Sequence, residues 1–135
     1  SIQTPAHTDV EARLEMIDDE LDSIIKMYHP TEMAIEELFF NTNHTTMVPV
    51  AEARGVILLC AKRNGLRVAE YTPLQVKQSV VGYGRAVKKQ VMHMVSLLLK
   101  LETTPKLDDT CDALAIAICH ANCSGSRVQG FYNQR

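Results

Sequence analysis

The sequence lacks the features that mark a membrane-embedded, exported or repetitive protein. It has no apolar run of about 18 residues that could span a bilayer, and no basic leader before a short apolar stretch. No internal repeat is visible in its 135 residues, of which 46% are hydrophobic. We therefore expect one globular domain over residues 1–123 and a flexible tail over 124–135, in a cytoplasmic protein without membrane contact.

Cysteine is scarce and lacks the spacing of a complete metal site. Cys119 and Cys123 are four residues apart, with His120 beside them, but a second pair of ligands at similar spacing is absent. This argues against structural zinc. We expect all four cysteines, which include Cys60 and Cys111, to lie in helices as small buried hydrophobic side chains.

The charge is unevenly distributed although the net charge is only −2. Residues 1–40 carry ten acids against Arg13 and Lys26, a balance of −8, so residues 41–135 carry +6. This split suggests a polyanionic partner for the second part, although a solvated basic surface is the commoner explanation of any single cluster.

Hydrophobic periodicity predicts a chain with five helices and two short strands. A capping box at Thr8 and Glu11 is expected to begin the first helix, and Pro49 the second. The expected helices cover residues 9–28, 49–63, 73–82, 85–101 and 107–123, and the expected strands cover residues 32–40 and 67–71.

The helix at 49–63 is apolar nearly all round in its middle, from Val56 to Ala61. Ala51 and Gly55, four residues apart, would let another helix approach closely. We infer a self-dimer through this helix. The alternative is a central helix covered on both sides within one subunit.

Three carboxylates are the candidate metal ligands. Asp109 and Asp112 share one face of the last helix at D-x-x-D spacing, which suits joint capture of a hard divalent cation. Glu36 stands near the end of an otherwise apolar strand, where a carboxylate is costly unless it is paired. The alternative for Asp109 and Asp112 is that, with Asp108, they lie in the first turn of the helix, where acids cap free amides and complement the dipole. The alternative for Glu36 is an exposed strand end.

Cations and aromatic rings form a second candidate set. Arg85, Lys88 and Lys89 crowd the expected first turn of the fourth helix, where cations oppose the helix dipole, so a phosphate contact would explain them. Phe39 and Phe40 cannot both point inward from one strand, and an exposed ring can stack on a base. A ring in the core is the simpler alternative.

Five blocks of sequence, in this order, resemble the RuvC family of Holliday-junction resolvases. They are Ala34–Phe39 (AIEELF), Glu52–Gly55 (EARG), Gln75–Gly82 (QVKQSVVG), Gln90–Val95 (QVMHMV) and Asp109–Ala117 (DTCDALAIA). The resemblance extends from about Ile2 to His120.

The resemblance implies an α/β protein of ribonuclease-H-like fold, and a homodimeric, magnesium-dependent bacterial endonuclease that makes paired nicks in four-way DNA junctions during recombination and repair. Manganese is expected to substitute for magnesium, and the branch-migration machinery is an expected partner. By motif position, Glu36, Asp109 and Asp112 match catalytic metal ligands, and Lys77 and Lys88 match lysines near the scissile phosphate. The expected DNA contacts are Phe39, Phe40, Arg54, Lys77, Arg85, Lys88 and Lys89.

Family members begin with strands that carry a further catalytic aspartate, and these strands are not found before Ser1. We therefore expect an N-terminally truncated sheet, a helix-dominated fold, and a bare strand edge at 32–38 that another segment or chain covers. The chain as given should bind metal weakly and cleave junctions poorly or not at all. The alternatives are a non-catalytic junction-binding module, and a related ribonuclease-H-like nuclease with another branched or RNA-containing substrate.

Overall fold

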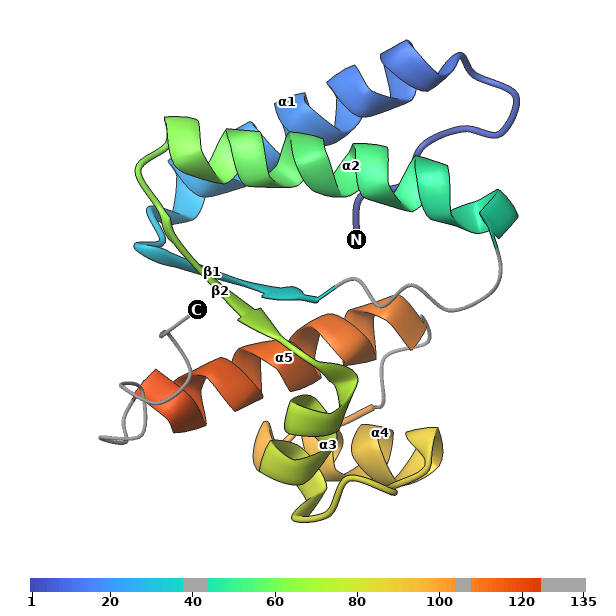
Figure 1. Cartoon of the computed structure of the whole chain (residues 1–135). Coiled ribbons are helices and arrows are strands. Elements are labelled where there is room, and N and C mark those ends of the chain that lie inside the picture. The colour runs from blue at the N-terminus through green and yellow to red at the C-terminus, as the bar shows by residue number, and fades with distance from the viewer. Residues whose placement is uncertain (38–43, 104–107, 125–135) are drawn as a thin grey trace. The chain divides into compact units, whose positions relative to one another are not determined.

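The computed structural model describes residues 1–37, 44–103 and 108–124 (Figure 1). Within these residues the chain forms the five helices and two strands that the periodicity predicts. In order they are α1 (Val10–Tyr28), β1 (Glu32–Glu36), α2 (His44–Arg63), β2 (Arg67–Tyr71), α3 (Pro73–Val81), α4 (Lys88–Leu98) and α5 (Asp108–Ser124). The helix-dominated fold with a small sheet is therefore confirmed.

The two strands pair in one parallel sheet joined by the crossover helix α2. The amide of Arg67 donates to the carbonyl of Thr31 over 3.1 Å at one end, and the amide of Glu37 donates to Tyr71 over 2.9 Å at the other. β1 ends at Glu36, one residue before this bond, and β2 ends at Tyr71. The strand expected over 32–40 is therefore too long at Glu37, and its remainder over 38–40 lies outside the described residues. Phe39 and Phe40 lie outside the described residues.

The chain divides into two compact units, and the division falls within both strands. Residues 1–33 and 38–69 belong to the first unit, and residues 34–37 and 70–135 to the second. The single domain expected over residues 1–123 stays a prediction. The tail expected over 124–135 lies outside the described residues except for Ser124, which ends α5.

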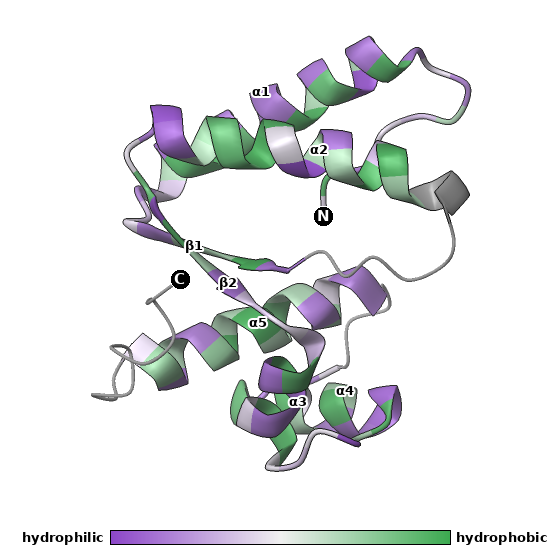
Figure 2. Ribbon diagram, in the orientation of Figure 1, coloured by the Kyte–Doolittle hydropathy of each residue, from purple (hydrophilic) through white to green (hydrophobic). Residues whose placement is uncertain are grey.

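The first unit is built from α1 packed on α2. Its buried residues are Ile25, Cys60, Ala61 and Leu66, with Leu21 and Met33 packed against them. Polar pairs fasten the same two helices, since Arg63 contacts Asp18 at 2.6 Å and Asn64 donates to Asp22 over 2.9 Å. The alternating hydropathy of α1 is visible in Figure 2, as expected for a helix with one apolar face.

Both helices of the first unit begin at positions other than those the sequence predicts. Asp9, not Thr8, is the N-cap of α1, and no side chain caps its amides, so the predicted capping box is wrong. The helix α2 begins at His44 and contains Pro49. Pro49 lies early in the helix, where its missing amide costs at most one of the first intrahelical hydrogen bonds. The left-handed end that Asn64 and Gly65 predict is confirmed by a φ of 75° at Gly65.

The second unit packs α3, α4 and α5 against one another. Val91 and Val95 form the buried face of α4, whereas Val87 and Leu98, which the periodicity places on that face, are 61% and 50% exposed. The cause is the length of α4, which begins only at Lys88 and ends at Leu98, so both residues lie at or beyond its ends. The core of α4 is therefore shorter than predicted.

The described helices show neither a membrane span nor a disulfide. No helix among them is long and apolar enough to cross a membrane. The four cysteines all lie in helices and are free; Cys60, Cys111 and Cys119 are buried and Cys123 is half-buried. The predicted role of cysteine as a buried hydrophobic side chain is confirmed for the first three.

Candidate active site

The second unit contains a pocket of about 240 Å³ that combines acidic and basic side chains. Its charged lining consists of Glu36 from β1, Lys77 from α3, Lys88 from α4 and Asp112 from α5, and its apolar lining of Pro73, Val76, Val91, Ala115 and Ile116. Val76, Val91 and Ala115 are buried in the core that joins the three helices. Two carboxylates and two ammonium groups thus share a pocket with a packed apolar floor.

Local sequence signals position the two lysines. Thr72 caps α3 in a full capping box: its hydroxyl accepts from the amide of Gln75 over 3.2 Å, and the side chain of Gln75 accepts from the amide of Thr72 over 2.8 Å. This start, with Pro73 at the first helical position, places Lys77 in the second turn. Similarly, the Gln90 side chain accepts from the amide of Val87 over 3.0 Å, so that Lys88 is the first residue of α4.

Lys88 joins α4 to α5 through two ion pairs. Its ammonium nitrogen lies 3.2 Å from Asp108 Oδ2 and 3.3 Å from Asp112 Oδ2. The hydrogen bond to Asp108 is the main cause that raises the pKa of Lys88, and Asp112 adds to it. Lys88 is therefore a permanent cation at this end of the pocket.

Polar contacts along α5 fix the helix that carries Asp112. The Tyr71 hydroxyl and His120 Nδ1 are 2.8 Å apart, Asn122 donates to Ser79 over 3.1 Å, and Cys119 Sγ lies 3.8 Å from the carbonyl of Gln75. Burial raises the pKa of Cys119 to about 11, so this thiol stays neutral at physiological pH. The contacts tie α5 to β2 and α3, and so hold Asp112 at the pocket.

The remaining expected site residues are dispersed. Asp109 is exposed and does not line the pocket. Arg85 lies in the turn before α4, not in its first turn, because α4 starts at Lys88; Lys89 is the second residue of α4, and both are exposed. Arg54 belongs to α2 in the first unit. Of the predicted site, the pocket brings together Glu36, Lys77, Lys88 and Asp112.

The oxygen donors of this pocket, the carboxylates of Glu36 and Asp112, are of the kind that a divalent cation such as magnesium binds. Among the described residues no three His, Cys, Asp or Glu side chains lie close enough to form a metal-binding group. Magnesium is, however, commonly held by one or two carboxylates, with water and substrate phosphate as its other ligands. Glu36 and Asp112 supply that number of carboxylates.

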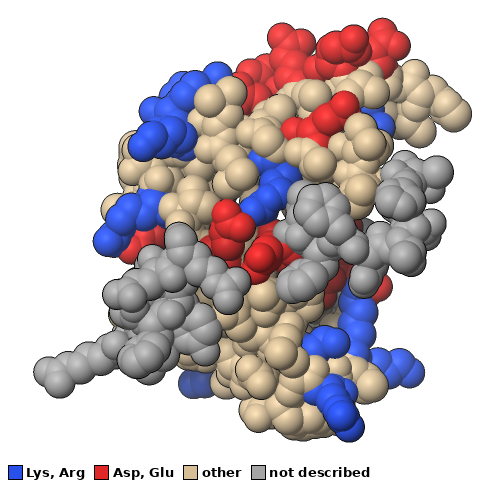
Figure 3. Space-filling model, viewed as in Figure 1, with Lys and Arg blue, Asp and Glu red and all other residues tan. Residues whose placement is uncertain are grey.

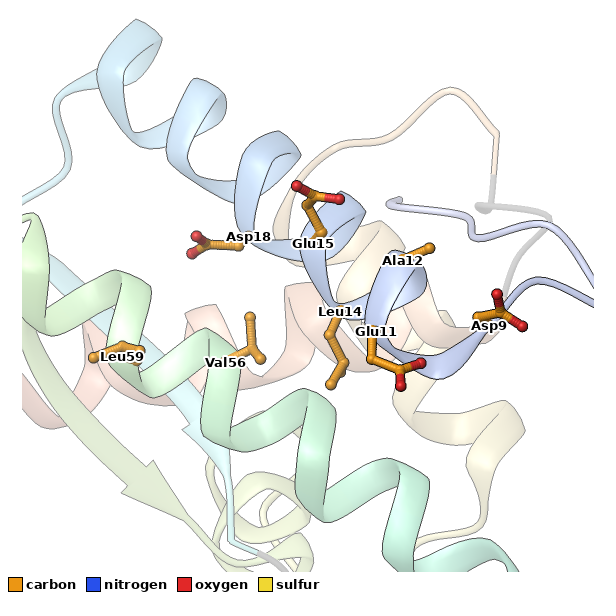
Figure 4. A pocket seen from close by; sticks show the side chains of 8 residues that line it. All are labelled: Asp9, Glu11, Ala12, Leu14, Glu15, Asp18, Val56 and Leu59. Carbon is orange, nitrogen blue, oxygen red and sulfur yellow. The ribbon is translucent and has the colours of Figure 1, made fainter.

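A second pocket, in the first unit, has the opposite character. It measures about 780 Å³, and Leu14 and Val56 face one another there between α1 and α2 (Figure 4). Its charged residues are all acidic: Asp9, Glu11, Glu15 and Asp18. Since carboxylates repel phosphate, this pocket is unsuited to a nucleic-acid backbone. On the face drawn in Figure 3, acidic side chains likewise gather over α1.

Asp108 is the site residue that the sequence interpretation missed. The sequence groups Asp108, Asp109 and Asp112 as acids of one helical turn, but only Asp108 and Asp109 lie in the first turn of α5. The available signal was the spacing of Asp108 and Asp112, which are four residues apart and so share a face. What could not be read was that α4 presents Lys88 to that face, since this depends on helix packing.

Comparison with solved structures defines the class of fold. The chain is similar to RuvC of Thermus thermophilus with a TM-score of 0.84 and 32% identity, over 92% of this chain and 75% of that one. The structure of the Thermus thermophilus RuvC in complex with Holliday junction substrate is similar with a TM-score of 0.86 and 32% identity, over 91% and 74% of the two chains. The fold is therefore that of a ribonuclease-H-like nuclease.

Sequence relatives identify the family. The family model described as crossover junction endodeoxyribonuclease RuvC matches residues 1–120, and the chain belongs to this family. It is 59% identical over 122 residues to the RuvC of Heliobacterium modesticaldum, covering 90% of this chain and 75% of the relative. It is 58% identical over 120 residues to that of Desulfitobacterium hafniense, covering 89% and 73%. The resemblance drawn from the five sequence blocks is confirmed.

Proposed function

We propose that this chain is a magnesium-dependent endonuclease that nicks four-way DNA junctions, with its reacting centre at the pocket of Glu36, Lys77, Lys88 and Asp112. The observation that carries the proposal is the placement of these four side chains in one pocket of the second unit. Family membership supports the reaction class, and the similar Thermus thermophilus RuvC in complex with Holliday junction substrate supports the substrate.

The two lysines suit the binding of a phosphodiester. Their ammonium groups would neutralise phosphate charge that the nearby carboxylates would otherwise repel. The apolar floor of Val76, Val91 and Ala115 keeps water from one side of the pocket and strengthens these charge interactions. Lys77 and Lys88 are thus assigned to holding the scissile phosphate beside Glu36 and Asp112.

The carboxylates are assigned to the metal. Glu36 and Asp112 would hold the divalent cation, with Asp109 as a further ligand that rests on motif position alone. When bound, magnesium supplies Lewis acidity to the phosphate undergoing displacement. Glu36 ends β1, so its side chain emerges where the strand ladder stops, and Asp112 emerges from a helix tied to β2 and α3.

We propose further that the active form is a homodimer joined through α2. Val48, Ala51, Gly55 and Leu59 recur at helical spacing and are all exposed, with Val48 at 58% and Leu59 at 56%. An exposed apolar stripe of this kind supports a helix–helix contact, and Gly55 has no atom near its missing side chain. A cytoplasmic location in bacteria and an association with branch-migration machinery follow from the family alone.

Cleavage of matched substrates tests the proposal. A four-way DNA junction, a linear duplex of the same sequence and an RNA–DNA duplex are each incubated with magnesium and excess protein, so that slow cutting is detected. We expect paired nicks at symmetric positions in the junction only. Cutting of the RNA strand would indicate the related nuclease with another substrate, and tight junction binding without any nick would indicate the non-catalytic binding module.

A further inference from the structure

Lys88 forms ion pairs with two carboxylates near the start of α5. Its ammonium is 3.3 Å from Asp112 and 3.2 Å from Asp108. The two carboxylates are four residues apart and share a helix face, so one cation can contact both. Lys88 is also the first residue of α4, where the helix dipole disfavours a cation, and the two carboxylates compensate for that placement.

We infer that Lys88 competes with the divalent cation for Asp112, and that Asp108 is a positioning residue that retains Lys88 when the divalent cation takes Asp112. The inference rests on the proposed function, because it requires that Asp112 is a metal ligand. It goes beyond that function by assigning a role to Asp108 and by making metal binding an exchange of cations.

The exchange follows from charge and exposure. An ammonium and a divalent cation repel one another strongly at ion-pair distance, so one carboxylate oxygen cannot serve both. The side chain of Lys88 is 48% exposed, that of Asp112 50% and that of Asp108 63%. Ion pairs this exposed are weak and rearrange easily, so Lys88 can leave Asp112 at small cost.

Asp108 gives Lys88 a place to go. It is paired with Lys88 but does not line the pocket. Lys88 can therefore release Asp112 and still remain beside the pocket, where a phosphate would need it. Lys77 provides the matched comparison, since it lines the same pocket and takes part in none of the ion pairs seen among the described residues.

Manganese binding without DNA tests the inference, with free Mn²⁺ measured by electron paramagnetic resonance. We expect Lys88→Gln to tighten Mn²⁺ binding about two- to fivefold, the range of an exposed ion pair. Lys88→Arg keeps the competing charge and should bind Mn²⁺ within about twofold of the unaltered protein. Lys77→Gln should have a smaller effect than Lys88→Gln.

A double-mutant cycle isolates the role of Asp108. Asp108→Asn leaves Lys88 on Asp112 alone and should weaken Mn²⁺ binding about two- to fivefold. In the Lys88→Gln background the same substitution should have little effect, since no ammonium remains to be retained. An equal loss in both backgrounds would mean that Asp108 acts only through its general negative charge, and would overturn its positioning role.

The outcomes separate this inference from the proposed function. If Asp112→Asn weakens Mn²⁺ binding but Lys88→Gln leaves it unchanged, the competition is refuted and the metal site stands. If Lys77→Gln and Lys88→Gln tighten binding equally, the specific pairing with Asp112 is refuted. If the unaltered protein binds no Mn²⁺, both the metal site and the exchange are refuted.

Discussion

Two of the three carboxylates predicted from the sequence, Glu36 and Asp112, line the pocket. A carboxylate at the end of an apolar strand indicated Glu36, and the strand does end there, with the side chain exposed at the pocket. The exposed strand end is confirmed for Glu36, and its role as a metal ligand stays a prediction. The spacing that indicated Asp112 also indicated Asp109, which is exposed one turn before Asp112, nearer the start of α5, and does not line the pocket.

The cysteines allow a prediction at the scale of single residues. Burial raises the pKa of Cys60 and that of Cys119, the latter to about 11, whereas Cys123 is only half-buried. We expect Ellman's reagent at pH 8 to modify Cys123 rapidly and the other three thiols only as the protein unfolds. Cys123→Ser should abolish the rapid phase. Rapid modification of that variant would show that another thiol is accessible in the fold.

The raised pKa of Cys119 predicts that the free energy of unfolding falls at high pH. Its pKa in the fold, about 11, lies above the ordinary value of 9.0. As the pH rises past 9 the unfolded chain therefore loses this proton first, and the free energy of unfolding falls until the folded thiol also ionises. Urea denaturation at pH 8 and pH 10 should show a smaller fall for Cys119→Ala than for the unaltered protein, and an equal fall would contradict the assignment.

At the scale of elements, the capping box of α3 is the clearest link between local sequence and the site. Replacing Thr72 by Ala leaves the amide of Gln75 without its acceptor and should lower the free energy of unfolding by about 1 kcal/mol. Thr72→Ser keeps the hydroxyl and should cost little. Urea denaturation followed by far-ultraviolet circular dichroism measures both. Equal losses for the two variants would mean that the methyl group, not the hydroxyl, matters.

Most elements could be predicted because periodicity and capping are local properties. The strand Arg67–Tyr71 and the start of α3 at Pro73 agree with the sequence, since the signals lie within a few residues. The end of β1 at Glu36 and the start of α4 at Lys88 could not be read. The first depends on where the partner strand stops, and the second on the Gln90 side chain reaching back to Val87. The pairing of Lys88 with Asp108 depends on packing between α4 and α5.

At the scale of the whole molecule, the division of charge predicts where DNA contacts fall. The acidic residues of 1–40 include those of α1, whereas Lys77, Arg85, Lys88 and Lys89 all belong to the second unit. We expect Lys89→Gln to reduce the slope of the logarithm of the junction-binding constant against the logarithm of salt concentration by about 1, which corresponds to one phosphate contact. Lys26→Gln is the control, because Lys26 pairs with Asp22 at 2.5 Å on the acidic helix α1. Equal slopes for the two variants would argue against DNA contact at Lys89.

Variants of the two pocket carboxylates separate cutting of the junction from binding to it. Four-way junction cleavage by excess protein with magnesium is compared between the unaltered chain, Glu36→Gln and Asp112→Asn, and junction affinity is measured for each. We expect both variants to bind the junction within about twofold of the unaltered chain and to lose at least about 100-fold in cleavage rate, because losing a metal ligand should cost more than the roughly 10- to 100-fold that losing a ligand's hydrogen-bond partner costs. Cleavage at the same rate by all three proteins would contradict the assignment of this pocket as the active site.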